Sequence, residues 1–333
     1  MTSGEGPVLV TGAGGFIGGH LVARLLAEGR EVRAADVKPF DDWYQVHEPA
    51  ENLILDLSQA ASCDRAVAGM ADVYNLAADM GGMGFIENNK ALCMLSVLIN
   101  THLLMSANRL GCERFFFASS ACVYPDYRQR ETDNPGLKES DAYPAMPEDG
   151  YGWEKLFSER LCRHFREDFG LDACSLRYHN VYGPHGTWAG GREKAPAAIC
   201  RKVAEAAIGD TGRIPIWGDG KQSRSFMYID DCVEGTRRMM DSDITEPLNL
   251  GSDEMVTIDE LVTIVEDIAG VRLERVYDLS APQGVRGRNS DNDLIEERLG
   301  WAPSISLRAG LEETYEWVHA QVAASGVSSG TAA

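Results

Sequence analysis

A glycine-rich turn constrains the fold of this chain more than any other stretch. It has the sequence TGAGGFIGGH (11–20) and joins a short apolar run, PVLVTG (7–12), to HLVARLLAEG (20–29), whose apolar residues recur at helical spacing. A strand, a glycine turn and a helix in this order let the backbone approach a pyrophosphate closely, while the first N–H groups of the helix point at it. The turn therefore predicts a dinucleotide site that depends on Gly12, Gly15 and Gly18.

Strand and helix patterns alternate through the first half of the chain. Helices are predicted over 95–111 and, further on, over 257–270. Additional strands are predicted at 31–36, 52–57, 72–78 and 114–120. Because strands separated by helices form parallel sheets with crossover connections, these patterns predict an α/β protein with a doubly wound parallel sheet of the Rossmann type.

The pattern becomes irregular after residue 178, where Gly and Pro are frequent. We therefore expect a second, smaller domain of mixed α/β structure at the C-terminal side, which binds substrate. The dinucleotide-binding domain is predicted at 1–178, and 223–252 is expected to return to it, with SFMY as a strand before a helix. The substrate domain is predicted at 179–222 and 253–333.

The charge balance narrows the choice of partners. The chain has 51 acidic and 31 basic residues, a formal net charge of −20, which disfavours nucleic acid and anionic membranes. We expect no stretch that approaches the roughly 20 apolar residues needed to span a bilayer, and the first residues lack the pattern of a secretory signal. The 8 cysteines lack CxxC or zinc spacing, so we expect reduced thiols, a cytoplasmic protein and no metal site.

Asp36 bears on the choice between the two nicotinamide dinucleotides. It ends the second predicted strand, and a carboxylate there accepts hydrogen bonds from both ribose hydroxyls and repels a 2′-phosphate. This favours NAD over NADP, although Arg33 and Lys38 are close enough in sequence to leave NADP open. Asp56 ends the third predicted strand. It is a candidate to contact the edge of the adenine ring, or it caps a turn.

The segment YGWEK (151–155) supplies candidate redox groups. Tyr151 and Lys155 stand four residues apart, so they share one face of a helix. A lysine ammonium beside a phenol lowers the phenol pKa, so Tyr151 is expected to act as a base near neutral pH while hydride leaves the same carbon for NAD. Ser120 is expected to hydrogen-bond the same substrate oxygen.

Five strings together resemble the extended short-chain dehydrogenase/reductase superfamily: TGAGGFIG, NLAA, ASSACVYP, YGWEK and RYHNVYGP. The resemblance implies a nucleotide-sugar substrate, a tightly held NAD and a homodimer. It also implies that the cofactor is contacted by Phe16, Ile17, Leu76 and Ala77.

Cys122 separates the possible reactions within that superfamily. Its 4,6-dehydratases carry an acidic pair where this chain has Ala121 and Cys122, so elimination of water is poorly supported. A 4-keto sugar has acidic hydrogens on C3 and C5, and inverting either centre takes one group that removes a proton and another that delivers one from the opposite face. Thiols and amines can be tuned for this work, and Lys194 is a candidate partner. From the residues alone, core packing is the simpler interpretation of Cys122.

Longer strings resemble the family of GDP-mannose 3,5-epimerases over residues 8–318: NLAADMGGMGFI (75–86), ASSACVYP (118–125), GTWAGGREKAPAA (186–198), WGDGKQSRSF (217–226) and QGVRGRNSDN (283–292). This resemblance implies that GDP-mannose becomes GDP-L-galactose, GDP-L-gulose or both through a transient 4-keto intermediate, with NAD recycled. By the same resemblance, Tyr151 and Lys155 carry the redox step, and Cys122 and Lys194 are the acid/base pair.

The resemblance also implies a set of substrate contacts. Arg288 would hold the diphosphate, although spacing alone does not separate it from Arg286. The full set is Gly81, Gly82, Ser120, Ala121, Cys122, Asn180, Glu193, Lys194, Ala195, Lys202, Gln222, Ser223, Arg224 and Arg288. A GDP-sugar 4,6-dehydratase, another nucleotide-sugar epimerase and a non-enzymatic NAD-binding regulator are the alternatives.

Overall fold

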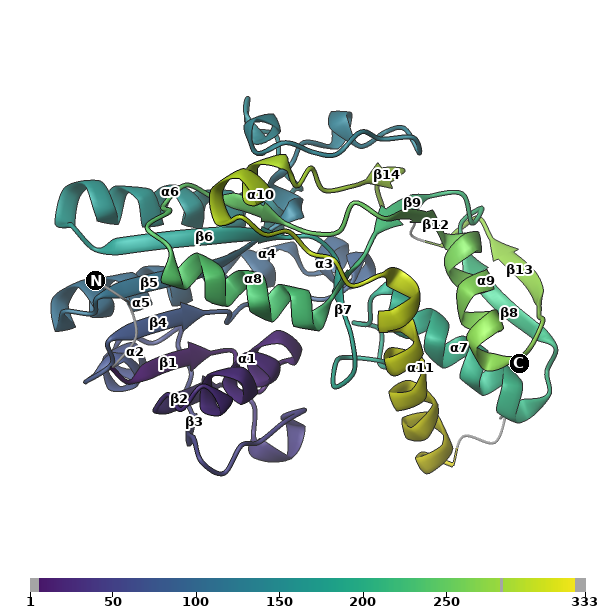
Figure 1. Ribbon diagram of the computed structural model, residues 1–333, viewed down its shortest axis with the longest axis horizontal. Coiled ribbons are helices and arrows are strands. Elements are labelled where there is room, and N and C mark those ends of the chain that lie inside the picture. Colours follow the sequence, from purple (N-terminus) through teal and green to yellow (C-terminus); the bar gives the residue numbers. More distant parts are fainter. Residues whose placement is uncertain (1–5, 282–283, 327–333) are drawn as a thin grey trace.

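The computed structural model describes residues 6–281 and 284–326. The outer limits of the predicted domains, at residues 1 and 333, and Gln283 of the last quoted string lie outside these ranges. The described chain forms a larger lobe built on one sheet and a smaller lobe beside it, to the right in Figure 1.

Seven parallel strands form the sheet of the larger lobe, in the order β11-β6-β5-β4-β1-β2-β3. Their bounds are β1 (Val8–Thr11), β2 (Val32–Asp36), β3 (Glu51–Ile54), β4 (Asp72–Asn75), β5 (Arg114–Ser120), β6 (Asp172–Tyr178) and β11 (Leu248–Leu250). The strand order proceeds in opposite directions from β1 and from β4, which opens a crevice at the carboxyl ends of these two strands. The predicted doubly wound Rossmann sheet is confirmed.

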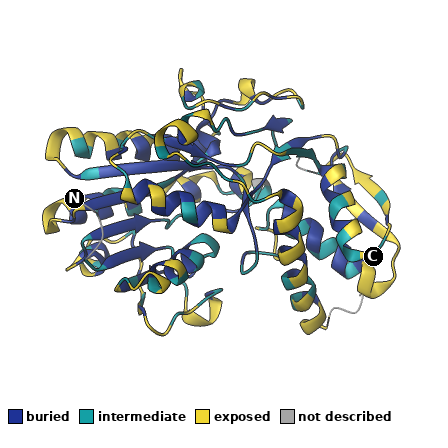
Figure 2. Ribbon diagram, viewed as in Figure 1, coloured by how far each residue is buried: buried dark blue, intermediate teal, exposed yellow. Residues whose placement is uncertain are grey.

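Helices cover both faces of this sheet because its strands bury side chains on both sides. Val8 and Val10 face the core under α1 (Phe16–Ala27) and α8 (Ile229–Asp241), whereas Leu9 faces the core under the helices of the other face. Those helices are α2 (Ala60–Val67), α5 (Ser96–Leu110) and α6 (Tyr151–Phe169). Figure 2 shows the inner strands of the sheet mostly buried and the outer sides of the helices exposed, whereas the edge strand β3 has no buried residue.

The smaller lobe is mixed α/β. Three helices, α7 (Ala195–Gly209), α9 (Ile258–Ala269) and α11 (Leu307–Ala324), pack on one another. A parallel pair, β8 (Arg213–Trp217) with β13 (Glu274–Asp278), lies beside a three-stranded sheet of β12 (Met255–Thr257), β9 (Ser223–Ser225) and β14 (Gly287–Arg288). Between the lobes, β7 (Val181–Tyr182) pairs with β10 (Met227–Tyr228). The short helices are α3 (Met83–Asn88), α4 (Lys90–Met94) and α10 (Asp293–Leu299).

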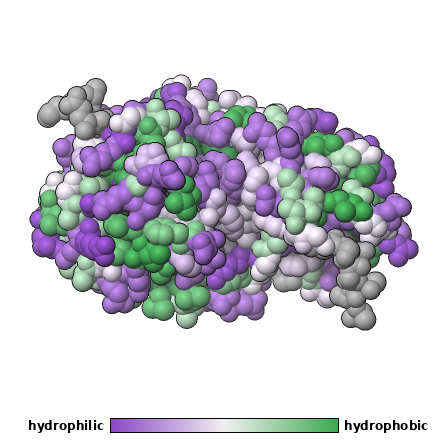
Figure 3. All heavy atoms as spheres, turned by 90° about the horizontal axis from the view of Figure 1, so that it is seen from below, coloured by the Kyte–Doolittle hydropathy of each residue, from purple (hydrophilic) through white to green (hydrophobic). Residues whose placement is uncertain are grey.

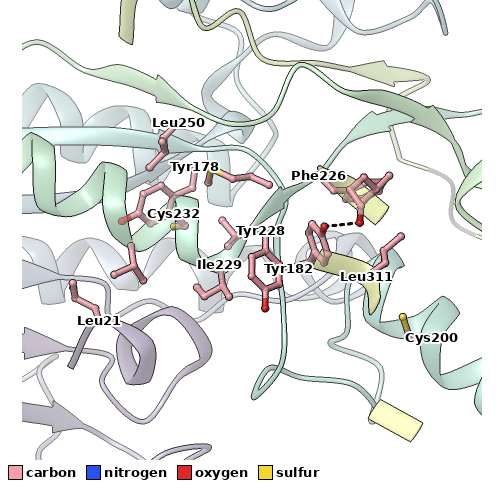
Figure 4. Packing of buried hydrophobic residues seen from close by; sticks show 14 of the residues in the cluster. Leu21, Tyr178, Tyr182, Cys200, Phe226, Tyr228, Ile229, Cys232, Leu250 and Leu311 are labelled. Carbon is pink, nitrogen blue, oxygen red and sulfur yellow. Dashed lines mark hydrogen bonds between the residues drawn. The ribbon is translucent and has the colours of Figure 1, made fainter. Parts of the chain in front are cut away.

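One hydrophobic cluster continues from the larger lobe into the smaller one. It includes Leu21 and Tyr178 beside the main sheet, Tyr182 between the lobes, and Leu311 on α11. Figure 4 shows these residues spread from the larger lobe to the smaller one. The Tyr182 hydroxyl donates a hydrogen bond to the carbonyl of Leu307 at 3.0 Å. The two lobes, which form the walls of the cleft between them, therefore share one continuous hydrophobic core.

The predicted strand in SFMY is β10, which leads into α8 and pairs with β7. Within 223–252 the chain rejoins the main sheet through β11. One expectation about elements needs correction. The first helix begins at Phe16, four residues before the predicted start, because the last glycines of the turn are already helical. The predicted strand at 114–120 and the predicted helix at 95–111 correspond to β5 and α5.

The expectation that no stretch is long and apolar enough to span a membrane is wrong for Lys90–Leu110. Because α4 extends α5, this helical stretch has 21 residues and qualifies by length and composition. Leu103, Leu104 and Ala107 of the stretch are buried in the core of the larger lobe, and core helices pass the same test.

The face of the molecule in Figure 3 is mostly hydrophilic, with smaller hydrophobic patches.

Candidate active site

Two cavities meet in the cleft between the lobes. The larger, about 1020 Å³, follows the carboxyl ends of the main sheet strands. The smaller, about 260 Å³, lies between the end of β5 and the smaller lobe. The residues that line both of them are Met80, Gly81, Ser120, Tyr151, Tyr178 and Lys194.

The larger cavity fits a dinucleotide because the glycine turn leaves room that side chains would fill. A Cβ on Gly18 would lie 2.2 Å from the carbonyl oxygen of Gly12, and one on Gly12 (φ +69°) would lie 2.9 Å from the backbone of Leu76. The cavity brings together every residue predicted to bind the cofactor: Gly12, Gly15, Phe16, Ile17, Gly18, Asp36, Asp56, Leu76, Ala77, Tyr151 and Lys155.

The groups around Asp36 favour an unphosphorylated ribose. Asp36 is buried at the end of β2 and accepts hydrogen bonds from the backbone N–H groups of Gly14 and Lys38, both at 3.0 Å. Arg33 pairs with Glu51 and does not line the cavity, and the Lys38 ammonium donates to the carbonyl of Gly14 at 2.7 Å. The two cations that left NADP open are thus both engaged elsewhere.

Sequence reasoning missed one wall of the larger cavity. Trp43 and Tyr44, which follow a short 3₁₀ turn at Phe40–Asp42, line the cavity together with Thr187. The Tyr44 hydroxyl donates to the Thr187 hydroxyl at 2.8 Å, so a loop of the larger lobe meets the loop before α7 across the cavity. The sequence signal for this wall was the pair of aromatic residues, Trp43 and Tyr44, in a largely polar loop.

Tyr151 and Lys155 are fixed by the first turns of α6. Both are buried, and the Lys155 ammonium lies 5.3 Å from the centroid of the Tyr151 ring and 3.4 Å from a carboxylate oxygen of Glu154. Gly152 allows this helix to approach the neighbouring segment, because a Cβ there would lie 2.3 Å from the carbonyl oxygen of Cys122. The glycine after the tyrosine therefore places the redox pair beside the thiol.

The expectation that Lys155 lowers the pKa of Tyr151 is wrong for this structure. Burial raises the pKa of the Tyr151 phenol well above its ordinary value, Cys122 and Glu154 raise it further, and a hydrogen bond with Ser120 opposes them. Removal of water around the ring disfavours the charged phenolate more than the nearby groups stabilise it.

Cys122 lies in a 3₁₀ turn (Ala121–Val123) directly after β5 and is 6% exposed at the wall of the smaller cavity. Its backbone N–H donates to the Ser120 hydroxyl at 3.2 Å. Its sulfur lies 3.7 Å from a guanidinium nitrogen of Arg288, which is itself buried. Although Cys122 is buried, it is therefore not confined to apolar packing, because its sulfur faces a cation.

Lys194 faces the same cavity from the other lobe. It directly precedes α7, whose first turn carries Pro196. Burial lowers the pKa of the Lys194 ammonium, Cys122 opposes this decrease, and Arg288 adds to it. Loss of hydration thus moves the lysine in the direction that proton transfer near neutral pH requires.

The smaller cavity also brings together most of the other predicted substrate residues: Gly81, Gly82, Ala121, Asn180, Glu193, Ala195, Lys202, Gln222, Arg224 and Arg288. Ser223 is the exception, because its hydroxyl donates to the carbonyl of Thr132, outside the cavity. Gln222 and Arg224 flank it along β9, and successive side chains of a strand point to opposite faces.

Arg286 and Arg288 are separated by their surroundings. Arg286 makes a two-point ion pair with Asp219, at 3.0 and 3.2 Å, and does not line the cavity, whereas Arg288 does. Arg201 also lines the cavity and pairs with Glu193 at 3.1 Å. Among residues 6–281 and 284–326, no group of three His, Cys, Asp or Glu side chains is placed to hold a metal ion.

Comparison with known proteins agrees with this geometry. Residues 8–251 match the NAD dependent epimerase/dehydratase family. The chain belongs to that family. A curated relative from Arabidopsis thaliana, GDP-mannose 3,5-epimerase, is 48% identical over 316 residues, which are 95% of this chain and 82% of the relative.

Solved structures of similar proteins share the fold. UDP-glucose 4-epimerase from Thermotoga maritima, solved with UDP-glucose, is 25% identical with a TM-score of 0.85 and covers 95% of this chain and 99% of its own. MoeE5 in complex with UDP-glucuronic acid and NAD is 28% identical with a TM-score of 0.80 and covers 95% and 100%. As a member of the NAD dependent epimerase/dehydratase family, the chain is an NAD-dependent enzyme. Its larger cavity, which fits a dinucleotide, is the candidate cofactor site.

Proposed function

We propose that this chain is a GDP-mannose 3,5-epimerase that forms GDP-L-galactose, GDP-L-gulose or both. The observation that carries the proposal is the junction of the two cavities, where Ser120 and Tyr151 lie beside Cys122 and Lys194. Inversion at C4 alone needs only Ser120 and Tyr151. The thiol of Cys122 and the amine of Lys194 add a second kind of step, the removal and return of protons on carbon. The relative from Arabidopsis thaliana supports GDP-mannose as the substrate.

The chain's own residues account for each proton transfer. Tyr151 takes the proton of the C4 hydroxyl as a phenolate, and Ser120 holds that hydroxyl by a hydrogen bond. Because burial raises the pKa of Tyr151, the phenolate needs the positive charge of the nearby Lys155 ammonium. Bound NAD supplies the hydride acceptor at C4 and returns the hydride at the end, so there is no net oxidation. While C4 is a carbonyl, Cys122 and Lys194 exchange protons with C5 and C3 from opposite faces, because the enolate delocalises the charge left on carbon.

The cations of the smaller cavity support an anionic diphosphate. Burial lowers the pKa of the Arg224 guanidinium to about 9, and the neighbouring Arg288 and Arg286 add to the decrease. The buried charges of Arg224 and Arg288 repel one another, and a diphosphate between these two side chains relieves that repulsion while it accepts hydrogen bonds from their planar guanidinium groups. Lys202 lines the same wall.

Incubation of the purified enzyme with GDP-mannose in deuterated water tests the proposal. We expect deuterium at C5 and C3 of the recovered nucleotide sugars, read by NMR and mass spectrometry, and L-sugar products. Recovery of GDP-mannose without deuterium at either carbon would overturn the proposal. A stable 4-keto-6-deoxy product, formed with loss of water, would instead identify a GDP-sugar 4,6-dehydratase.

We also propose a cytoplasmic homodimer without nucleic-acid or membrane partners. Exposed apolar side chains on two adjacent helices support the dimer: Leu95 and Met105 on and beside α5, and Phe157 on α6, are each more than half exposed. The 8 unpaired cysteines support a reducing compartment, and the net charge of −20 disfavours polyanions. The molar mass from light scattering, measured as the protein elutes from a size-exclusion column, tests the dimer. The variant Phe157→Glu is expected to elute as a monomer.

A further inference from the structure

Gln129 is a buried polar residue that neither the sequence nor the proposed mechanism assigns a role. It follows a short 3₁₀ turn (Asp126–Arg128) and is 1% exposed. Its side-chain N–H₂ group donates to the carbonyls of Tyr124 and Pro125, both at 3.2 Å. Because these two bonds fix the orientation of the amide, its oxygen is directed at the Nε of Arg288, at 2.5 Å.

The backbone of Gln129 also holds the strand that carries this arginine. Its carbonyl accepts hydrogen bonds from the N–H groups of Arg286 and Gly287, at 3.0 and 3.2 Å. Arg288 is thereby fixed twice, through its strand and through its side chain, and the guanidinium then reaches the sulfur of Cys122 at 3.7 Å. Arg177 and Arg286 form ion pairs with Glu159 and Asp219. Among the described residues Arg288 has no such ion pair, and Glu148 is a carboxylate that its charge influences.

The electrostatic consequence concerns the thiol. A cation near a sulfur that is largely shielded from water stabilises the thiolate relative to the thiol. Gln129 directs that cation without carrying a charge of its own, whereas a glutamate there would neutralise it. The titratable groups that interact with Cys122 or Arg288 from the surrounding elements are Glu148, Tyr151, His179, Lys194 and Arg224.

We propose that Gln129 is a positioning residue that holds Arg288 against Cys122, so that the cysteine enters the reaction as a thiolate. The inference rests on the proposed function for its chemical use. The thiolate takes the proton from C5, the C–H electron pair moves into the enolate of the 4-keto sugar, and the Lys194 ammonium delivers a proton to the opposite face. Transfer of the proton from the thiol to the Lys194 amine through water restores the starting pair.

Alkylation of Cys122 tests this without any sugar. The rate of reaction of the purified enzyme with iodoacetamide is measured against pH, with the labelled peptide quantified by mass spectrometry and Cys122→Ser as the blank. In Gln129→Leu we expect the midpoint of the rate profile to move up by about one pH unit, with alkylation about tenfold slower at neutral pH, since only the thiolate reacts. Gln129→Glu should move it in the same direction.

Several outcomes distinguish this role from others. An unchanged midpoint in folded Gln129 variants would overturn the proposal, and a higher KM for GDP-mannose with an unchanged midpoint would show that Arg288 serves the diphosphate alone. If Gln129→Leu does not fold, Arg288→Gln gives the same measurement, because it removes the cation and keeps the backbone bonds of Gln129. If the wild-type enzyme does not turn over GDP-mannose, the proposed function fails while the alkylation profile still decides this inference.

Discussion

The two cavities that meet at Ser120 and Tyr151 are built in different ways. The cofactor cavity includes a turn of small residues, with Gly12 and Gly18, in which backbone atoms leave the room at the end of β1. The sugar cavity is formed by side chains from segments far apart in the chain, such as Cys122 after β5, Lys194 before α7 and Arg288 on β14. The glycine turn of the first cavity depends on local backbone conformation, and the second cavity depends on long-range polar contacts.

Because of this difference, a substitution in each cavity should impair a different property of the enzyme. A substitution in the glycine turn changes the shape of the backbone, so it should remove the cofactor and with it every step. A substitution in the sugar cavity removes one side chain from a preserved frame, so it should remove one step and leave the cofactor bound. The four predictions below start from that contrast.

Cys122→Ala should give the largest effect on one step. Loss of one member of an acid/base pair removes about 10³-fold of the rate of proton exchange on carbon, while NAD content should stay at the wild-type level because Cys122 does not line the cofactor cavity. Deuterium incorporation into GDP-mannose measures the exchange. Cys112→Ser, in the core of the larger lobe, is the control, and exchange that survives in Cys122→Ala would remove the thiol from the chemistry.

Gly18→Ala should damage the other cavity. The new Cβ would lie 2.2 Å from the Gly12 carbonyl oxygen and 2.8 Å from Ala13, so the turn must shift, and NAD affinity should fall about 100-fold, or roughly 2.7 kcal/mol. Gly15→Ala, whose Cβ would meet the same oxygen at 3.0 Å, should lose less. Calorimetric titration with NAD measures both, and equal affinities in the two variants would contradict a steric cause. Alkylation of Cys122 should be unaffected.

The same contrast explains what the sequence could predict. Strands β1 to β5 of the main sheet and the glycine turn were predicted because their signals are local: apolar runs, glycine spacing and a helix start. Strands β6 and β11 of the same sheet were not predicted. The two- and three-residue strands of the sugar side, such as β9 and β14, are too short for a periodic pattern. Cys122 and Lys194 came from resemblance. Gln129 gave no signal, because a buried amide in a loop is recognised only by its partners, and the pKa of Tyr151 depends on burial, which spacing does not reveal.

His179, which directly follows β6, should make stability depend on pH. Its ring is fully buried beside Tyr124 and donates a hydrogen bond from Nε2 to the side-chain oxygen of Asn249. Burial lowers the pKa of this ring to about 3. Because the unfolded chain binds a proton on this ring below pH 6.5 and the folded chain does not, the free energy of unfolding should fall by roughly 1.4 kcal/mol per pH unit between pH 6.5 and about 3. Above pH 6.5 this contribution is constant.

Denaturant titrations at pH 7 and pH 4.5 measure that loss. His179→Gln should show a smaller difference between the two values of pH by about 2–3 kcal/mol, since glutamine takes up no proton. His164→Gln, at an exposed position of α6, is the matched control and should behave as the wild type. A His179→Gln variant with the full pH dependence would assign the acid sensitivity to other groups.

Arg201→Gln should give the smallest effect, confined to substrate affinity. Arg201 ties the loop before α7 by pairing with Glu193 at 3.1 Å and by donating to the carbonyl of Trp188 at 3.1 Å. Loss of these charge-assisted bonds costs roughly 1.5 kcal/mol of loop order, so KM for GDP-mannose should rise about tenfold, with little change in kcat once the sugar is bound. Arg272→Gln, an exposed arginine paired with Asp267, should leave both constants unchanged. Equal losses in kcat and in affinity for Arg201→Gln would show that the loop positions Lys194 during proton transfer, and the sugar cavity would then depend on its backbone as the cofactor cavity does.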